Sequence, residues 1–237
     1  MVNKKERGCE IGQGMPQRAI LLELENVAVK GRQIVYDVLK SVLADKGIDL
    51  TSMTFSRYCL YPFVKHFLPA LLAAEGKKRL SEDKLLAEIT QGITLSITDD
   101  SIKLESGLAD VLKIAEEKKV LVGVLSGLGE KTARQLLAKL GLTEMGVHLL
   151  PYSCEDKNFP SADAWLKLAK IMSVPPALCL VIATSATACK AALSAGMRCV
   201  VVPDRFTTFQ DFGGADHIAE DFDKTTVKTI FALLKPC

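Results

Sequence analysis

Two glutamates near the start of the chain are the residues best placed to do chemistry. Residues 20–29 read ILLELENVAV, an apolar run that predicts a buried strand, and Glu23 and Glu25 are its only charged members. Because side chains two residues apart share one face of a strand, we expect both carboxylates to project the same way at its carboxyl end. Ligands of open parallel α/β sheets bind at that end. Carboxylates placed there can act as nucleophiles, as acid–base groups or as ligands of a hard cation.

The remaining chain indicates how these residues are positioned. Residues 33–46 have apolar residues at helical spacing and end at Gly47, and no strand-like alternation occurs between 35 and 105. Beyond 105, helices are predicted at 108–118, 130–140, 162–172, 186–194 and 225–234, and strands at 120–125, 148–150, 179–182, 199–202 and 215–218. This alternation predicts an α/β fold, a doubly wound parallel sheet with a helical block inserted after its first strand.

Composition narrows the class of protein. The 237 residues are 49% hydrophobic, and 30 basic residues against 28 acidic ones give a net charge of +2, so nothing favours a nucleic-acid partner. No apolar run approaches the roughly 20 residues of a membrane span. Seven cysteines without a Cys-x-x-Cys pair predict reduced thiols and a cytoplasmic location. Residues 1–17 lack an apolar stretch and are expected to form a polar tail, not a secretory signal.

Four segments resemble the motifs of the haloacid dehalogenase superfamily. Residues 20–29 match its apolar strand followed by Asp-x-Asp-Gly, with Glu at both Asp positions, and VLVGVLSGLGE at 120–130 matches the second motif. Residues 155–182 resemble the third motif with its helix and strand, and ATSATACKAALSAGMRCVVVPD at 183–204 matches the fourth after its first two positions. The resemblance is to the phosphatase and phosphoglucomutase-like branch. It implies a Rossmann-type core at 18–34 and 106–237, interrupted by a small helical cap domain at 35–105.

The resemblance implies phosphoryl transfer by carboxylates. In the family the first Asp attacks phosphorus, Mg²⁺ bridges this Asp to the phosphate and to an acidic residue of the fourth motif, and the second Asp transfers the leaving-group proton. Glu23 and Glu25 take these catalytic positions here, each with one extra methylene. A displacement of about 1 Å can lower a rate about a hundredfold, and a proton donor must lie within hydrogen-bonding reach. The alternative is that both are solvated or hydrogen-bonded carboxylates at a strand end.

The metal position is altered as well. The fourth motif has Ala183 and Thr184 where the family has acidic residues. Mg²⁺ is usually held by one or two carboxylates, so Glu23 and Thr184 together would form a weak site at most. Ser185 and Thr187 are expected to cap the following helix instead of binding a metal.

The predicted phosphate-binding residues are Ser126, Gly127 and Lys157. In the family the hydroxyl at the Ser126 position and nearby backbone amides bind a phosphate oxygen, and Gly127 allows close approach of the backbone. Lys157 is the candidate for the third-motif lysine, which neutralises phosphate charge. Counting back from the following helix instead places Phe159 at that position, and Lys131 is an alternative lysine.

Other polar residues give a weaker signal. The helical block includes residues in the region where cap residues of the family often contact substrate, namely Arg57, Tyr58, Tyr61 and His66. A lone His or Tyr on an apolar helix is, however, more often a core or surface residue than a ligand. His148 and His217 have no partner at metal-ligand spacing.

Two functions follow from these observations. The first is a superfamily member with degenerate motifs and little or no magnesium-dependent phosphatase activity, which retains an anion pocket for binding or regulation. The alternative is an active hydrolase of small phosphate esters with Glu23 as nucleophile. A metal-independent dehalogenase is the least supported, because that branch also uses an Asp nucleophile. The expected partner is a small phosphorylated molecule, with neither nucleic acid nor membrane involved.

Overall fold

The computed structural model describes residues 17–61, 63–77, 80–152 and 159–234. In this part of the chain a six-stranded parallel sheet has the order β3-β2-β1-β4-β5-β6. The strands are β1 (Ala19–Glu23), β2 (Leu121–Ser126), β3 (His148–Pro151), β4 (Cys179–Ala183), β5 (Arg198–Val201) and β6 (His217–Ile218). The predicted doubly wound α/β sheet is therefore confirmed.

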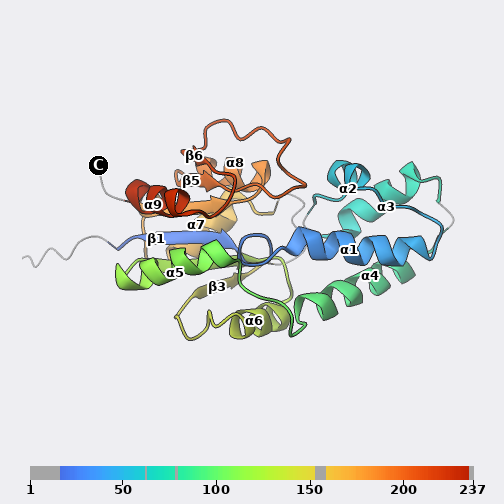
Figure 1. The fold of residues 1–237 in the computed structure, drawn as a ribbon, viewed down its shortest axis with the longest axis horizontal. Coiled ribbons are helices and arrows are strands. Elements are labelled where there is room, and N and C mark those ends of the chain that lie inside the picture. The colour runs from blue at the N-terminus through green and yellow to red at the C-terminus, as the bar shows by residue number, and fades with distance from the viewer. Residues whose placement is uncertain (1–16, 62, 78–79, 153–158, 235–237) are drawn as a thin grey trace, which may run out of the picture.

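Helices cover both faces of the sheet (Figure 1). One face packs against α5 (Ser106–Glu117), α6 (Glu130–Lys139) and α9 (Lys224–Leu233), and the other against α7 (Ala162–Ile171) and α8 (Ala186–Ser194). Ile20 and Leu22 of β1 belong to the first core, whereas Ala19 and Leu21 belong to the second. The strand is continuously apolar because it is buried on both faces. A short 3₁₀ helix, η2 (Pro176–Leu178), precedes β4.

The helical block lies beyond the carboxyl end of β1, at one end of the molecule (Figure 1). It comprises α1 (Gly31–Ala44), α2 (Ser52–Tyr58), α3 (Val64–Ala74) and α4 (Glu82–Ile97). Among the described residues of 35–105 there are helices and loops only, as predicted. The block has its own apolar core, which includes Leu39, Phe55 and Phe67 and is joined by Phe206 from the loop after β5. The domain boundaries assigned from the sequence stay a prediction.

The predicted strand over 20–29 is wrong in its second half. β1 ends at Glu23, and the chain enters a five-residue π-helical turn, η1 (Leu24–Ala28). Strand pairing ends at this point: Glu23 is the last residue of β1 matched to β2, and Leu22 is the last matched to β4. Gly31 fits closely under this turn, since a Cβ there would lie 2.1 Å from the Glu25 carbonyl oxygen. Glu25 therefore belongs to a turn and is not on the strand face of Glu23.

No helix in the described ranges is long and apolar enough to span a membrane.

Candidate active site at the carboxyl edge of the sheet

Polar side chains gather where four neighbouring strands end. Glu23 ends β1, Ser126 ends β2, Thr184 follows β4, and Asp204 lies just beyond β5. Glu23, Ser126 and Thr184 are all buried. These strands lie side by side in the order β2-β1-β4-β5, so the sheet topology places all four residues along one edge. The structure thus brings together residues that are up to 181 positions apart in the chain, Glu23 and Asp204 (204 minus 23).

Glu25 fills the predicted anion site with its own carboxylate. Its Oε1 accepts hydrogen bonds from the Ser126 hydroxyl at 2.9 Å and from the Leu128 backbone N–H at 2.8 Å. We call Glu25, Ser126, Gly127 and Leu128 the anion half of the site. A hydroxyl and a backbone amide that converge on one oxygen are the donors that an oxyanion requires. In this structure that oxyanion is supplied by the protein itself.

Burial raises the pKa of Glu25 from 4.5 to about 7. Hydrogen bonds from its own backbone, Ser126 and Leu128 oppose this shift, and the nearby Glu23 carboxylate adds to it. The net effect follows from placing a carboxylate where water is scarce and another carboxylate is close. Glu25 is therefore poised to change charge near neutral pH.

The second half of the site is organised by an arginine. Arg32 Nη1 donates to Thr184 Oγ1 at 2.7 Å and to Asp204 Oδ2 at 2.6 Å. The Arg32 side chain is 11% exposed and that of Asp204 is 32% exposed, so this ion pair is partly shielded from water. We call Glu23, Asn26, Arg32, Thr184 and Asp204 the cation half of the site.

Glu23 lies in the cation half with one oxygen unsatisfied. Its Oε1 accepts from Asn26 Nδ2 at 3.1 Å, whereas its buried Oε2 has no hydrogen-bond partner among the described residues. Burial raises the pKa of Glu23, the Arg32 charge and the Asn26 hydrogen bond lower it, and Asp204 raises it. The net direction is upward, so ionising Glu23 is unfavourable in this environment.

The loop after β5 is fixed to the neighbouring strand end. Thr207 Oγ1 donates to the Thr184 carbonyl oxygen at 2.7 Å, and Asp204 Oδ1 accepts from the Phe206 N–H at 2.8 Å. The Phe206 ring lies 4.6 Å from that of Phe55 and 5.3 Å from that of Tyr36, measured between centroids. The loop that presents Asp204 is therefore packed into the core of the helical block.

The residues do not fit a magnesium ion. Across the described ranges, no group of three or more His, Cys, Asp or Glu side chains is arranged to hold a metal. Glu23 is a single carboxylate, and the Thr184 hydroxyl is occupied by the Arg32 guanidinium. A hard divalent cation needs several available oxygen ligands. Here the Thr184 oxygen and one Asp204 oxygen are already bonded to Arg32.

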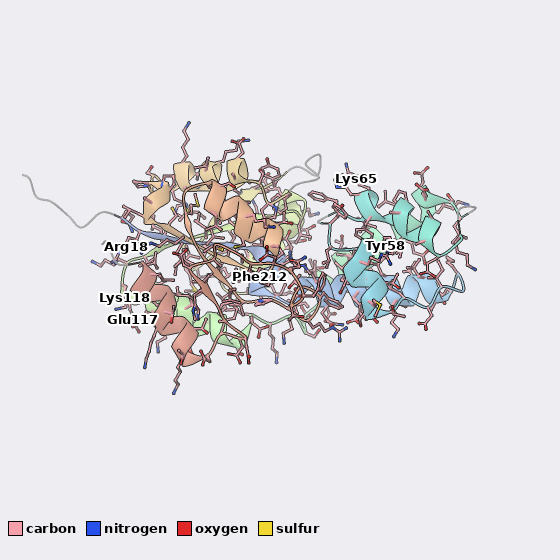
Figure 2. The ribbon with its side chains drawn as sticks, turned by 90° about the horizontal axis from the view of Figure 1, so that it is seen from above. Arg18, Tyr58, Lys65, Glu117, Lys118 and Phe212 are labelled. Carbon is pink, nitrogen blue, oxygen red and sulfur yellow. The ribbon has the colours of Figure 1, made fainter. Side chains whose placement is uncertain are left out.

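A cavity of about 680 Å³ joins the site to the helical block. Its lining includes Glu23, Glu25, Arg32 and Gly127 from the sheet side. The helical block contributes mainly apolar and aromatic side chains together with two cations, among them Phe55, Phe63, Phe67, Arg57 and Lys65. Figure 2 shows Lys65 and Tyr58 in the helical block and Arg18 at the opposite end of the molecule.

The predicted cap residues divide into two groups. Arg57 and Tyr61 line the cavity, whereas Tyr58 and His66 are not among its lining residues. The Arg57 guanidinium lies 5.4 Å from the Tyr58 ring centroid, and the His66 ring lies 5.5 Å from that of Phe63. Tyr58 and His66 therefore each contact a residue that lines the cavity.

The remaining predicted residues have varied positions. Lys157 lies outside the described residues. Phe159, which takes the lysine position when counted back from α7, lines the cavity, whereas Lys131 is exposed on α6 and does not. Ser185 caps α8 as expected, since its Oγ accepts from the Ala188 N–H at 3.3 Å, and Thr187 lines the cavity.

Sequence reasoning missed Asn26, Arg32 and Asp204. Asp204 follows an apolar strand, so the rule that singled out Glu23 could have found it. Arg32 lies in the first turn of α1, where a cation opposes the positive end of the helix dipole and therefore needs an acidic partner. Asn26 had no comparable signal, because its contact with Glu23 depends on the π-helical turn.

Comparisons with known proteins agree with this architecture. No family model matches the chain. YhcW of Bacillus subtilis, whose phosphatase name is itself provisional, is 23% identical over 204 residues, which cover 86% of this chain and 91% of YhcW.

Two solved structures superpose on most of the chain. CbbY of Rhodobacter sphaeroides, solved with phosphate, has a TM-score of 0.70 at 19% identity and covers 88% of this chain and 96% of its own. A family IA haloacid dehalogenase-type hydrolase of Entamoeba histolytica has a TM-score of 0.75 at 16% identity, covering 93% and 100%. At such low sequence identity, these superpositions establish the shared fold alone.

Proposed function

We infer that this chain is a binding member of the haloacid dehalogenase superfamily, with little or no magnesium-dependent phosphatase activity. Its fold is that of the superfamily and confirms the resemblance of its motifs. The observation that carries the proposal is the Glu25 carboxylate on the Ser126 and Leu128 donors. CbbY was solved with phosphate, and we propose that a small phosphorylated molecule uses the same donors here after displacing Glu25. Binding is then an exchange of one anion for another.

The electrostatics of the site, which disfavour nucleophilic attack on a phosphate ester, support this proposal. Attack by Glu23 would bring the phosphate ester against a further carboxylate, and the Arg32 guanidinium nearby is already bonded to Thr184 and Asp204. Nucleophilic attack requires ionised Glu23, whose pKa burial raises. The raised pKa of the nucleophile position and the occupied metal position therefore both oppose turnover.

One observation favours the alternative of an active hydrolase. Glu23 Oε2 is buried, lacks a hydrogen-bond partner among the described residues, and belongs to a side chain that lines the cavity. A carboxylate that lines the cavity and has one oxygen without a hydrogen bond from the described residues is a candidate nucleophile. The two proposals thus differ in whether this oxygen reaches phosphorus.

A turnover screen separates the two proposals. The purified protein is supplied with Mg²⁺ and a panel of small phosphate esters, beside the variant Glu23→Asp/Thr184→Asp. We expect no phosphate release above background from the unmodified protein. Hydrolysis by the unmodified protein that disappears in Glu23→Gln would establish the hydrolase instead.

We also propose a reducing, cytoplasmic location. The support is that Cys59, Cys179, Cys189 and Cys199 are free and buried.

A further inference from the structure

We propose that Arg32 is a built-in cation of this site, a positioning residue that balances the charge of the strand-end carboxylates and excludes a divalent metal. The proposal concerns how the site is charged and does not depend on whether the protein hydrolyses phosphate esters. It rests on the position of the guanidinium among Thr184, Asp204 and Glu23.

The contacts of Arg32 span the strand ends that a metal would bridge. One nitrogen, Nη1, bonds the hydroxyl that follows β4 and the carboxylate that follows β5. The same guanidinium interacts electrostatically with Glu23 at the end of β1. One positive group therefore bonds two strand ends directly and acts electrostatically on the third.

The charge of Arg32 is permanent. A guanidinium is not deprotonated in proteins, and the charge-assisted bond to Asp204 is short at 2.6 Å. A divalent cation entering beside it would meet like charge at close range in a shielded site. It would also find the Thr184 oxygen and one Asp204 oxygen already engaged.

The local backbone holds Arg32 in this place. The preceding residue, Gly31, packs under the Glu25 carbonyl so closely that a side chain cannot fit. Arg32 lies in the first turn of α1, where the helix dipole disfavours a cation. The Asp204 carboxylate offsets this disadvantage, so the pair forms a unit built from two distant segments.

Removal of Arg32 is expected to create a metal site. In Arg32→Ala, the Glu23 and Asp204 carboxylates and the Thr184 hydroxyl are left without their cation, and oxygens of this kind suit Mn²⁺ and Mg²⁺. The probe is Mn²⁺ alone, with free Mn²⁺ measured by electron paramagnetic resonance. We expect Arg32→Ala to bind Mn²⁺ at least tenfold more tightly than the unmodified protein, and the gain to disappear in Arg32→Ala/Glu23→Gln.

Two controls test the role of charge. Arg32→Lys keeps a positive charge and should bind no more Mn²⁺ than the unmodified protein. Arg134→Ala removes an arginine from an exposed ion pair with Glu130 on α6 and should also show no gain. A gain in Arg32→Lys equal to that in Arg32→Ala would contradict the proposal.

If Arg32→Ala does not fold, a second variant tests whether Arg32 excludes a divalent metal. Thr184→Asp adds a carboxylate while keeping Arg32, and we expect the new group to pair with the guanidinium without raising Mn²⁺ affinity. A tenfold gain in Thr184→Asp would overturn the proposal. So would Mn²⁺ binding by the unmodified protein that Glu23→Gln abolishes, or a folded Arg32→Ala that shows no gain.

Discussion

The two halves of the site satisfy their charges in different ways. In the anion half, neutral donors from Ser126 and Leu128 hold Glu25, a carboxylate whose pKa is about 7. In the cation half, the Asp204 carboxylate holds the Arg32 guanidinium through an ion pair between opposite charges. The comparison teaches that neutral donors hold the internal ion of one half and an opposite charge holds that of the other; we propose that the first half is exchangeable and the second is fixed.

The largest effect is expected from breaking the fixed half. Arg32→Ala leaves Asp204 unpaired and Glu23 without a nearby cation, and should lower the free energy of unfolding by about 3 kcal/mol. Urea denaturation measures the loss. Arg134→Ala, which breaks an exposed ion pair, should cost less than about 1 kcal/mol. Similar losses in both variants would show that burial does not strengthen the Arg32 pair.

The next effect concerns the exchangeable half. Glu25→Ala frees the Ser126 hydroxyl and the Leu128 N–H, and should raise the affinity for sulfate by about tenfold, which corresponds to about 1.4 kcal/mol. Isothermal titration calorimetry measures the dissociation constant. Glu25→Ala/Ser126→Ala should lose most of the gain, because one of the two donors is then absent. An unchanged affinity in Glu25→Ala would mean that Glu25 does not compete with external anions.

Competition by Glu25 should depend on pH. With its pKa near 7, Glu25 is mainly protonated at pH 6 and mainly ionised at pH 8, so sulfate affinity should fall by about tenfold over this range. Sulfate keeps its charge throughout, so the change reports on the protein. Glu25→Gln should flatten the profile, and a profile that persists in this variant would assign the dependence to another group.

The same pKa has a consequence for stability. The folded-state pKa of Glu25 lies above its ordinary value of 4.5, so the folded state binds the proton more tightly than the unfolded state does. The resulting stabilisation is fully present below about pH 4.5 and is lost as the pH rises through about 7. Denaturation midpoints of the unmodified protein and Glu25→Gln should therefore differ in slope between pH 5 and 7. Parallel slopes would contradict the raised pKa.

The smallest effect is expected at Asn26. Asn26→Ala removes the 3.1 Å hydrogen bond to Glu23 Oε1 and should cost about 1 kcal/mol. Gln33→Ala, which removes an exposed hydrogen bond to Asp37 on the surface of α1, is the matched control and should cost less. A cost for Asn26→Ala no greater than this control would show that the Glu23 contact contributes little.

Much of the fold could be predicted from local patterns. The alternation of apolar strands and amphipathic helices after residue 105 marks the sheet, because a parallel strand buried on both faces must be continuously apolar. Helical spacing identified α1, and Gly47 follows it at φ +70°, a conformation that favours glycine. These features depend on neighbours within a few residues, so the sequence displays them directly.

Only part of the site could be predicted, because several of its features depend on residues far apart in the chain. Glu23 was found from its place at the end of an apolar strand, and Ser126 and Thr184 from the resemblance to the second and fourth motifs of the superfamily. The sheet topology brings all three to one edge. The strand predicted for Glu25 was wrong, since the point where β1 loses its partners depends on β2 and β4. Lys157 lies outside the described residues, and its role stays a prediction.

The sequence by itself determined that carboxylates, hydroxyls and glycine would line one edge of an α/β sheet, because periodicity fixes strands and strands fix that edge. The tertiary structure alone decided which groups satisfy one another. Glu25 reaches donors 101 and 103 residues away, and Arg32 reaches an acceptor 172 residues away. Such pairings depend on side-chain length and backbone direction in three dimensions, and no pattern of neighbouring residues encodes them.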